Sequence, residues 1–274
     1  MKSPAAPRFL TIRYLGQVGF SLQLGGLTVV IDPYLTDAVD RAAGFPPGFW
    51  TRRYPPPVLP TDMHDVDLVL CTHDHLDHTD PETLRGINEA SPRCHFAGPL
   101  ITVQAIIDAG IPADRTSVLK EGAPFAFADV IIHPIAAAHE QYDRDPQGHD
   151  RFLGYILHWE DLHLYHAGDT VLTGTLLDTL KDHPLHVAFL PINGGNLGRR
   201  QLDIVGNMDS AEAMSLAHCL AAGKGLDLMV PTHFDLYPFN GAELSHFAEA
   251  WDKTPMPKPK FKVFLPGEAI HYRY

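Results

Sequence analysis

Cysteine and long apolar runs are both scarce in this sequence. The three cysteines, Cys71, Cys94 and Cys219, are widely spaced and form no CxxC pair. A disulfide framework is therefore not expected, and a reducing, cytoplasmic setting is predicted. No apolar run approaches the roughly 20 residues that cross a bilayer, and residues 1–7 lack the apolar stretch of a secretory signal. We therefore expect neither a membrane partner nor export.

Clusters of basic residues are also missing. The formal net charge is −12, with 33 acidic and 21 basic side chains, whereas proteins that bind phosphate backbones group Lys and Arg together. A nucleic-acid partner is therefore not expected. The apolar share of 45% and the charged share of 20% are ordinary for a globular protein and exclude a disordered chain. Histidine is abundant, with 17 residues, which directs attention to metal-ligand spacing.

The organisation of the chain changes near Asp67. Before it lies an irregular stretch, 34–65, rich in proline and aromatic residues, which is either a functional or partner-contacting loop or a floppy insertion. After it, buried strands alternate with helical segments, which predicts a layered α/β fold. No break in composition marks a linker, so residues 1–274 are expected to form a single domain. One strand leads into Asp32 and another into Gly168-Asp169, as two related sheet halves would.

Individual elements are indicated by short apolar runs, helical periodicity and capping residues. Two helix starts carry caps: Asp80 precedes Pro81, and Asp209 stands three residues before Glu212. Strands are expected at 9–15, 20–24, 27–31, 68–71, 94–97, 130–135, 152–158, 162–166, 187–190, 228–230 and 262–265. Further helices are expected at 100–109, 175–181, 211–222 and 242–251.

The segment after the expected strand 68–71 concentrates the metal-binding side chains. It reads Thr72-His73-Asp74-His75-Leu76-Asp77-His78. His73 and His75 are two residues apart, so they point the same way in an extended chain and can share one ion. The following turn would present Asp77 and His78 to a second ion. Imidazole and carboxylate are the ligands that Zn²⁺, Mn²⁺ or Fe use in hydrolytic sites, and the alternative is a polar loop that happens to be rich in histidine.

These residues carry a resemblance to a known superfamily. The run from His73 to His78 resembles the HxHxDH signature of the metallo-β-lactamase-fold hydrolases. The other landmarks of that superfamily have candidates in the same order, namely Asp32, His139, Asp169 and His233. Shorter matches resemble the L-ascorbate 6-phosphate lactonase group, at Leu15-Gly16-Gln17, 72–78, 166–170 and Gly206-Asn207-Met208. The resemblance implies a four-layer αβ/βα sandwich of two mixed β-sheets flanked by helices.

The resemblance also implies a centre of two divalent metal ions, Mn or Zn, with Fe as a further candidate. One ion would be held by His73, His75 and His139, the other by Asp77, His78 and His233, and Asp169 would bridge them. Asp77 would have a catalytic role, orienting a metal-bound hydroxide and moving its proton.

Four of these positions also have ordinary structural explanations. Asp32 would hydrogen-bond a ligand from behind, yet it could be only a turn residue before Pro33. His139 could lie on the surface, Asp169 could cap a helix and His233 could be a core histidine.

Residues after the expected strand 187–190 are candidates for substrate binding. Arg199 or Arg200 could clamp a phosphate or carboxylate through paired donors, and Asn193 could donate to a carbonyl oxygen. Surface arginines without a ligand are the alternative. Trp50 and Tyr237 could line the pocket.

Together these features predict a metal-dependent hydrolase that uses a metal-bound hydroxide on a small polar or anionic molecule. A lactone such as a sugar-phosphate lactone is the specific expectation. A phosphodiesterase of the nuclease or phospholipase D type is the main alternative, and a non-catalytic, metal-stabilised assembly module ranks last. The aromatic, proline-rich stretch 34–65 suggests a contact between subunits of a homo-oligomer.

Overall fold

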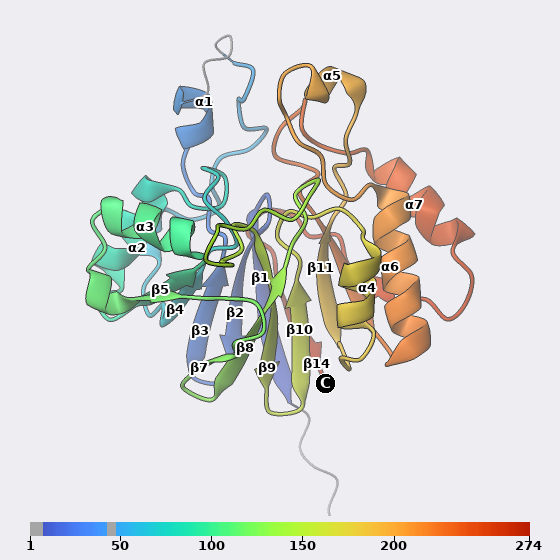
Figure 1. Ribbon diagram of the computed structural model, residues 1–274, viewed down its shortest axis with the longest axis horizontal. Coiled ribbons are helices and arrows are strands. Elements are labelled where there is room, and N and C mark those ends of the chain that lie inside the picture. The colour runs from blue at the N-terminus through green and yellow to red at the C-terminus, as the bar shows by residue number, and fades with distance from the viewer. Residues whose placement is uncertain (1–7, 43–47) are drawn as a thin grey trace, which may run out of the picture.

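Two seven-stranded sheets lie face to face at the centre of the molecule, and helices cover the outer face of each (Figure 1). This is a computed structural model, and it describes residues 8–42 and 48–274. The N-terminal segment 1–7 and residues 43–47 of the proline-rich stretch lie outside the described part. The arrangement confirms the predicted four-layer αβ/βα sandwich of two mixed sheets.

The first sheet has the strand order β14-β1-β2-β3-β4-β5-β6. Its pairs are antiparallel from β14 to β3 and parallel from β3 to β6. The strands are β1 (Phe9–Gly16), β2 (Gly19–Leu24), β3 (Leu27–Ile31), β4 (Leu68–Leu70), β5 (His95–Gly98), β6 (Thr116–Val118) and β14 (Ala269–Arg273).

The second sheet repeats this pattern in the order β7-β8-β9-β10-β11-β12-β13. Its pairs are antiparallel from β7 to β10 and parallel from β10 to β13. The strands are β7 (Phe125–Phe127), β8 (Val130–Ala136), β9 (Leu153–Trp159), β10 (Leu162–His166), β11 (Val187–Pro191), β12 (Leu228–Thr232) and β13 (Lys260–Phe261). Strands β3 and β10 therefore hold equivalent places in their sheets. The sequence predicts this, because one strand leads into Asp32 and another into Asp169.

The helices pack on the outer faces of the sheets. Buried side chains of α2 and α3 contact the first sheet, and those of α4, α6 and α7 contact the second (Figure 1). Both predicted caps are present, because Asp80 accepts the N–H of Glu82 and Asp209 with Glu212 forms a capping box. The α-helices are α1 (Ala38–Ala42), α2 (Pro81–Ala90), α3 (Leu100–Asp108), α4 (Gly174–Leu180), α5 (Leu197–Arg200), α6 (Ser210–Gly223) and α7 (Leu244–Lys253), and the 3₁₀ turns are η1 (Pro60–Asp62) and η2 (Ala113–Arg115).

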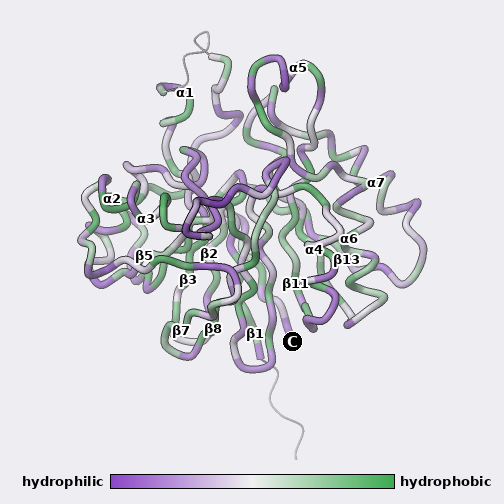
Figure 2. Tube along the Cα trace, in the orientation of Figure 1, coloured by the Kyte–Doolittle hydropathy of each residue, from purple (hydrophilic) through white to green (hydrophobic). Residues whose placement is uncertain are grey.

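The main core lies between the two sheets. Alternate residues of each strand face it, for example Leu10 and Ile12 from β1 and Ile132 and Leu157 from the second sheet, all at most 1% exposed. Each such side chain contributes about 1.5–3 kcal/mol when removed from water. Strand β4 is buried along its whole length, as its continuous apolar run predicts. In Figure 2 the apolar residues follow the strands, and the loops that cross above them are largely hydrophilic.

Strand register brings the polar strand ends to one edge of the sandwich. Ile31 of β3 pairs with Leu70 of β4, so the chain leaves both strands side by side. In the second sheet Pro191 pairs with Thr232, so β11 and β12 also end together. Loops at this edge project side chains from a rigid base. Among the described residues, no helix has the length and apolarity that a membrane span requires.

Candidate metal centre

The histidine-rich loop after β4 is held in one conformation by its own backbone. The N–H groups of His78 and Thr79 both donate to the carbonyl oxygen of His75, at 3.0 and 2.8 Å. The Thr79 hydroxyl donates to the carbonyl oxygen of His73 at 2.5 Å. This tight turn directs the side chains of His73, His75, Asp77 and His78 toward the second sheet, as the spacing predicts.

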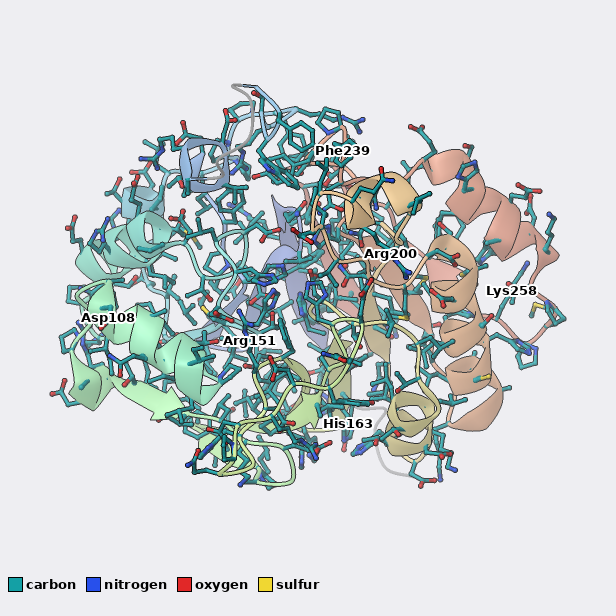
Figure 3. The ribbon with its side chains drawn as sticks, turned by 45° about the horizontal axis from the view of Figure 1, so that its top comes forward. Asp108, Arg151, His163, Arg200, Phe239 and Lys258 are labelled. Atoms are coloured by element: carbon teal, nitrogen blue, oxygen red, sulfur yellow. The ribbon has the colours of Figure 1, made fainter. Side chains whose placement is uncertain are left out.

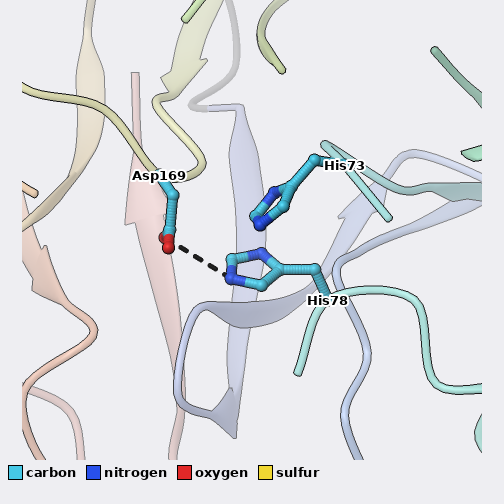
Figure 4. Close-up of side chains that lie close together, drawn as sticks. All are labelled: His73, His78 and Asp169. Atoms are coloured by element: carbon cyan, nitrogen blue, oxygen red, sulfur yellow. Dashed lines mark ion pairs between the residues drawn. The ribbon is translucent and has the colours of Figure 1, made fainter. Parts of the chain in front are cut away.

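Asp169 lies at the centre of the cluster. It follows β10 after the Gly168 turn, and its Oδ1 lies 3.4 Å from Nε2 of His78 (Figure 4). Its Oδ2 lies 3.4 Å from Nε2 of His233 and 4.0 Å from Nε2 of His139. One carboxylate from the second sheet therefore faces imidazoles that come from three different loops.

The remaining candidates complete two neighbouring groups. Asp77 Oδ2 lies 3.6 Å from Nε2 of His233 and 3.8 Å from Nε2 of His78. The potential ligand atoms of Asp77, His78 and His233 lie within 4.8 Å of one another, and so do those of His73, His78 and Asp169. The ring of His75 lies 4.5 Å from that of His73.

His139 joins this group through His75, since their ring centroids are 5.2 Å apart. The structure thus brings all seven predicted ligands together: His73, His75, Asp77, His78, His139, Asp169 and His233.

Three buried atoms of this cluster fit a bound cation. His73 Nε2, His78 Nε2 and Asp169 Oδ1 have no hydrogen-bond partner within the described part of the chain. Buried polar atoms are normally hydrogen-bonded, because leaving one unsatisfied costs about 1–3 kcal/mol. Imidazole nitrogens and carboxylate oxygens that converge without a hydrogen-bond partner are ligands that Zn²⁺ or Mn²⁺ accepts.

Asp32 fixes the His78 ring from behind. The fully buried carboxylate accepts a hydrogen bond from Nδ1 of His78 at 2.9 Å. It also accepts the backbone N–H and the hydroxyl of Thr72, both at 2.7 Å. Because Nδ1 of His78 lies against Asp32, Nε2 is the nitrogen that faces Asp169. Asp32 therefore lies behind a predicted ligand, where the resemblance places it.

A chain of amides orients His139 in the same way. Nδ1 of His139 lies 3.0 Å from Oδ1 of Asn207, so this nitrogen carries the proton and Nε2 faces Asp169. Asn207 Nδ2 donates to Asn193, and Asn193 Nδ2 donates to Asn240, each at 3.1 Å. The sequence analysis did not place Asn207 in the site, although the Gly206-Asn207-Met208 match contains it.

Gln17 is a second residue that sequence reasoning missed. It sits in the turn between β1 and β2 with a φ of 59°, and its side chain is fully buried. Its Nε2 donates to Oδ2 of Asp77 at 2.9 Å, and its carbonyl oxygen accepts the N–H of His233 at 2.9 Å. The Leu15-Gly16-Gln17 match is the signal that contains it.

Burial and charge shift the titration of the cluster in opposite directions. Burial lowers the pKa of His73 well below its ordinary value and lowers that of His139 to about 4. Burial alone would raise the pKa of Asp169, but the neighbouring His233 and His78 outweigh it and hold that pKa well below the usual range. Asp169 is therefore ionised, with charge available to compensate a cation.

A cavity of about 440 Å³ opens above the cluster. Its floor includes His75, Asp77, His139, Asp169 and His233. A small molecule in this cavity would contact the candidate metal ligands directly, and a volume of this size is typical of small-molecule sites.

The three residues expected to bind substrate do not reach this cavity. Asn193 is 6% exposed, and its amide is used by Asn207 and Asn240. Arg199 is 5% exposed, because its guanidinium donates to backbone carbonyls instead of facing the cavity. The acceptors are the carbonyl oxygens of Asn193, Gly194, Phe239 and Gly241. The expected clamp at Arg199 is therefore corrected to a structural role.

Of the other candidates, Arg200 lies outside the cavity, Trp50 lines it and Tyr237 lies behind Trp50. The exposed guanidinium of Arg200 lies 3.5 Å from Glu140, at the end of the molecule that carries α5 (Figure 3). It is absent from the cavity wall. Trp50 lines the cavity, whereas Tyr237 packs behind it, with ring centroids 5.1 Å apart.

A histidine and aspartate cluster at the shared edge of two such sheets defines a metallo-hydrolase fold of the metallo-β-lactamase type. The chain belongs to the beta-lactamase superfamily domain family, whose sequence profile matches residues 11–233.

The relatives support this assignment. The protein named probable L-ascorbate-6-phosphate lactonase UlaG from Shigella boydii is 26% identical, over 95% of this chain and 79% of its own length. A possible metal-dependent hydrolase from Veillonella parvula has a TM-score of 0.75 at 17% identity, covering 96% of this chain and 99% of that one. Igni18, a metallo hydrolase from Ignicoccus hospitalis, has a TM-score of 0.70 at 21% identity, covering 97% and 100%. The likeness to the lactonase group expected from the sequence is confirmed.

Proposed function

We propose that the protein is a metal-dependent hydrolase of a small molecule and that the reaction is the opening of a lactone ring. The observation that carries this proposal is the convergence of seven imidazole and carboxylate side chains on the floor of a cavity. Three of their buried atoms lack a hydrogen bond within the described structure. The name of the relative from Shigella boydii, a probable lactonase, supports the class of reaction.

The proposed ligand sets are those that the resemblance implies. His73, His75 and His139 would hold one ion, Asp77, His78 and His233 the other, and Asp169 would lie between them. Zn²⁺ and Mn²⁺ are the proposed occupants. Divalent ions in this position supply Lewis acidity toward a carbonyl oxygen and lower the pKa of water.

Asp77 is the proposed proton carrier. Its side chain is 18% exposed and lines the cavity, whereas Gln17 holds one of its oxygens from behind. In the reaction, water adds to the lactone carbonyl carbon, the ring C–O bond breaks and the released alkoxide takes up a proton. A carboxylate positioned at the floor can accept the proton of the water and return it to the leaving oxygen.

Metal depletion tests the proposal. The protein would be stripped with a chelator, reloaded with Zn²⁺ or Mn²⁺, and assayed on a lactone and on a phosphodiester side by side. We expect lactone hydrolysis only in the reloaded protein, and a loss of about 100-fold or more in Asp77→Asn assayed at saturating metal. Hydrolysis by the stripped protein would refute metal dependence. Faster cleavage of the diester would replace lactonase with phosphodiesterase, and full metal loading without any hydrolysis would favour a non-catalytic module.

A further inference from the structure

The cavity wall that faces the candidate metal centre is mostly apolar. Two protruding segments form it: the segment with α1, and the segment that follows α5, which stand on either side of this end of the molecule (Figure 1). They contribute Val39, Trp50, Ile204 and Val205 to the lining. The far end of a bound substrate, away from the reacting bond, meets these side chains.

Among the described residues that line the cavity, none is Lys or Arg. The charged groups beyond the metal-binding cluster are the carboxylates of Asp74 and Asp203. Asp74 is already paired with Arg151 through two hydrogen bonds of 2.8 and 3.0 Å.

Four arginines close to the wall in sequence have protein partners, and the first of them, Arg41, pairs with Asp37 and Glu82. Arg199 donates to backbone carbonyls, and Arg200 lies beside Glu140. Arg52 donates to the carbonyl oxygens of Tyr34 and Thr36, at 3.2 and 2.6 Å. Each therefore has protein partners and lies outside the lining.

An anionic tail would be poorly accommodated by this wall. A phosphate or carboxylate removed from water needs charged or hydrogen-bonding partners, which sites that bind such groups supply through Arg or Lys. At this wall the tail would meet aliphatic and indole surface and the like charge of Asp203. At the floor, Asp77 and Asp169 offset the charge of bound cations, so the wall decides which tail is accepted.

A neutral hydrogen-bond donor remains available on the wall. Asn240 lines the cavity, and its Oδ1 accepts a hydrogen bond from Asn193 at 3.1 Å. This bond fixes the amide so that Nδ2 is the atom Asn240 can offer to a substrate. An ether or carbonyl oxygen can accept from it without bringing any charge into the cavity.

We propose that the cavity takes an uncharged lactone or ester with an apolar tail and discriminates against analogues whose tail carries a phosphate or carboxylate. The inference rests on the proposed hydrolase function and narrows its substrate class. It differs from the sugar-phosphate lactone expected from the sequence, which stays a prediction. Val205 is the proposed specificity-determining residue, because it lies on the wall and is only half-buried.

A pair of matched substrates tests the inference. The metal-loaded enzyme would be assayed on a δ-lactone with a five-carbon alkyl tail and on the same ring with a tail of equal length that ends in a carboxylate. We expect kcat/KM to favour the neutral lactone at least tenfold. Val205→Arg should raise kcat/KM for the anionic lactone about tenfold and lower it for the neutral one. Equal rates in the unaltered enzyme, or a preference for the anionic lactone, would overturn the inference.

The matched control is Leu202→Arg. Leu202 lies in the same segment and is 40% exposed, and it is not part of the cavity lining. It therefore adds the same charge nearby without placing it on the wall, and the ratio of the two kcat/KM values should not change. A shift as large as that of Val205→Arg would mean that general charge, rather than the wall, sets the preference.

A binding measurement separates this inference from the proposed function. Trp50 lines the cavity, so an alkyl tetrahydropyran, which cannot be hydrolysed, should change its fluorescence, and the carboxylate-tailed analogue should not. Trp50→Phe should remove the signal. Selective binding of the neutral probe without hydrolysis of any lactone would uphold the cavity's preference and refute the hydrolase. Hydrolysis with preferential binding of the anionic probe would do the reverse.

Discussion

The side chain of Gln17 donates a hydrogen bond of 2.9 Å to the carboxylate of Asp77, a residue 60 positions further along the chain. The backbone of the same residue accepts the N–H of His233 at 2.9 Å. One turn residue thus holds two predicted metal ligands, one through its amide and the other through its carbonyl oxygen. Its φ of 59° lies in the left-handed region, where a non-glycine residue is kept only by surroundings that determine it fully.

Removing the Gln17 amide should weaken catalysis more than substrate binding. Gln17→Ala leaves Asp77 free to rotate, so at saturating metal we expect kcat to fall about tenfold, with KM nearly unchanged. Steady-state kinetics and metal analysis of the purified variant measure this. Gln23→Ala, at an exposed position of β2 in the same hairpin, is the control. An unchanged kcat in Gln17→Ala would show that Asp77 needs no support from this residue.

Neutralising Asp32 should weaken metal binding. Asp32→Asn keeps the shape of the side chain but loses the charge that holds Nδ1 of His78, and loss of such a partner costs about 10–100-fold in metal affinity. Competition with a chelator of known affinity measures the change. Asp37→Asn, whose exposed carboxylate pairs with Arg41, is the control and should bind metal normally. Equal affinities in the two variants would contradict the role of Asp32.

Metal removal should destabilise the fold. The atoms of His73, His78 and Asp169 that lack a hydrogen bond are buried in the described structure. A cation that satisfies them would therefore bind the native state and not the unfolded chain. A ligand at a thousandfold excess over its Kd stabilises by about 4 kcal/mol. We expect Tm to fall with chelator and to rise again with the concentration of added Zn²⁺ or Mn²⁺, as followed by calorimetry. A Tm that does not change with chelator or added metal would count against the metal site.

Arg199 should matter for stability. Arg199→Met leaves buried carbonyl oxygens without their donor, and each such orphan costs about 1–3 kcal/mol. We expect the free energy of unfolding to drop by about 3 kcal/mol in total, measured by urea denaturation. Arg200→Met removes an exposed guanidinium and should change stability by less than about 0.5 kcal/mol. Comparable losses in both variants would refute the structural role.

A row of histidines on the second sheet should make stability depend on pH. The rings of His158 and His163 stack at 4.1 Å, and that of His186 stacks 6.1 Å from His163 (Figure 3 labels His163). Burial, together with the neighbouring His158 and His186, lowers the pKa of His163 to about 4. In the unfolded chain the pKa of this imidazole is near 6.5. As pH falls, the unfolded state therefore binds a proton here before the folded state does.

Between pH 6.5 and about 4 the unfolded state holds more protons at this position, so the contribution of His163 to stability is lost as pH falls through that window. Urea midpoints measured from pH 4 to 7 should flatten in His163→Gln relative to the unaltered protein. The exposed His246 provides the control, and His246→Gln should keep the original slope. Identical slopes in all three proteins would contradict the assignment.

Site residues could be predicted from the sequence where a local motif contains them. They could not be predicted where their role depends on partners that are distant in the sequence. His73 to His78 follow a strand whose apolar run can be seen in the sequence, and parallel strand ends meet at one edge, so their convergence with Asp169 and His233 could be expected. Arg199 could not be interpreted in the same way, because its partners are backbone carbonyls that leave no trace in residue type. A basic side chain in a loop looks the same whether it faces a ligand or the protein.

The fold shows the same division. Most strands of both sheets were expected from their apolar runs, whereas β6, β7 and β14 were missed and the expected strand 262–265 is replaced by β13 at Lys260–Phe261. Strand β14 has no fully buried residue, and it pairs with β1 from the opposite end of the chain, with His271 beside Thr11. An edge strand whose partner is so distant carries only a weak pattern of its own.

The candidate ligands are divided between the two repeated sheet halves, with His73 to His78 on the first and His139, Asp169 and His233 on the second. The first sheet also needs β14 from the C-terminal end of the chain, so a site built from both halves would be complete only after the two sheets have docked. An ion bound there would be lost when the seam between the sheets opens, before either sheet unfolds.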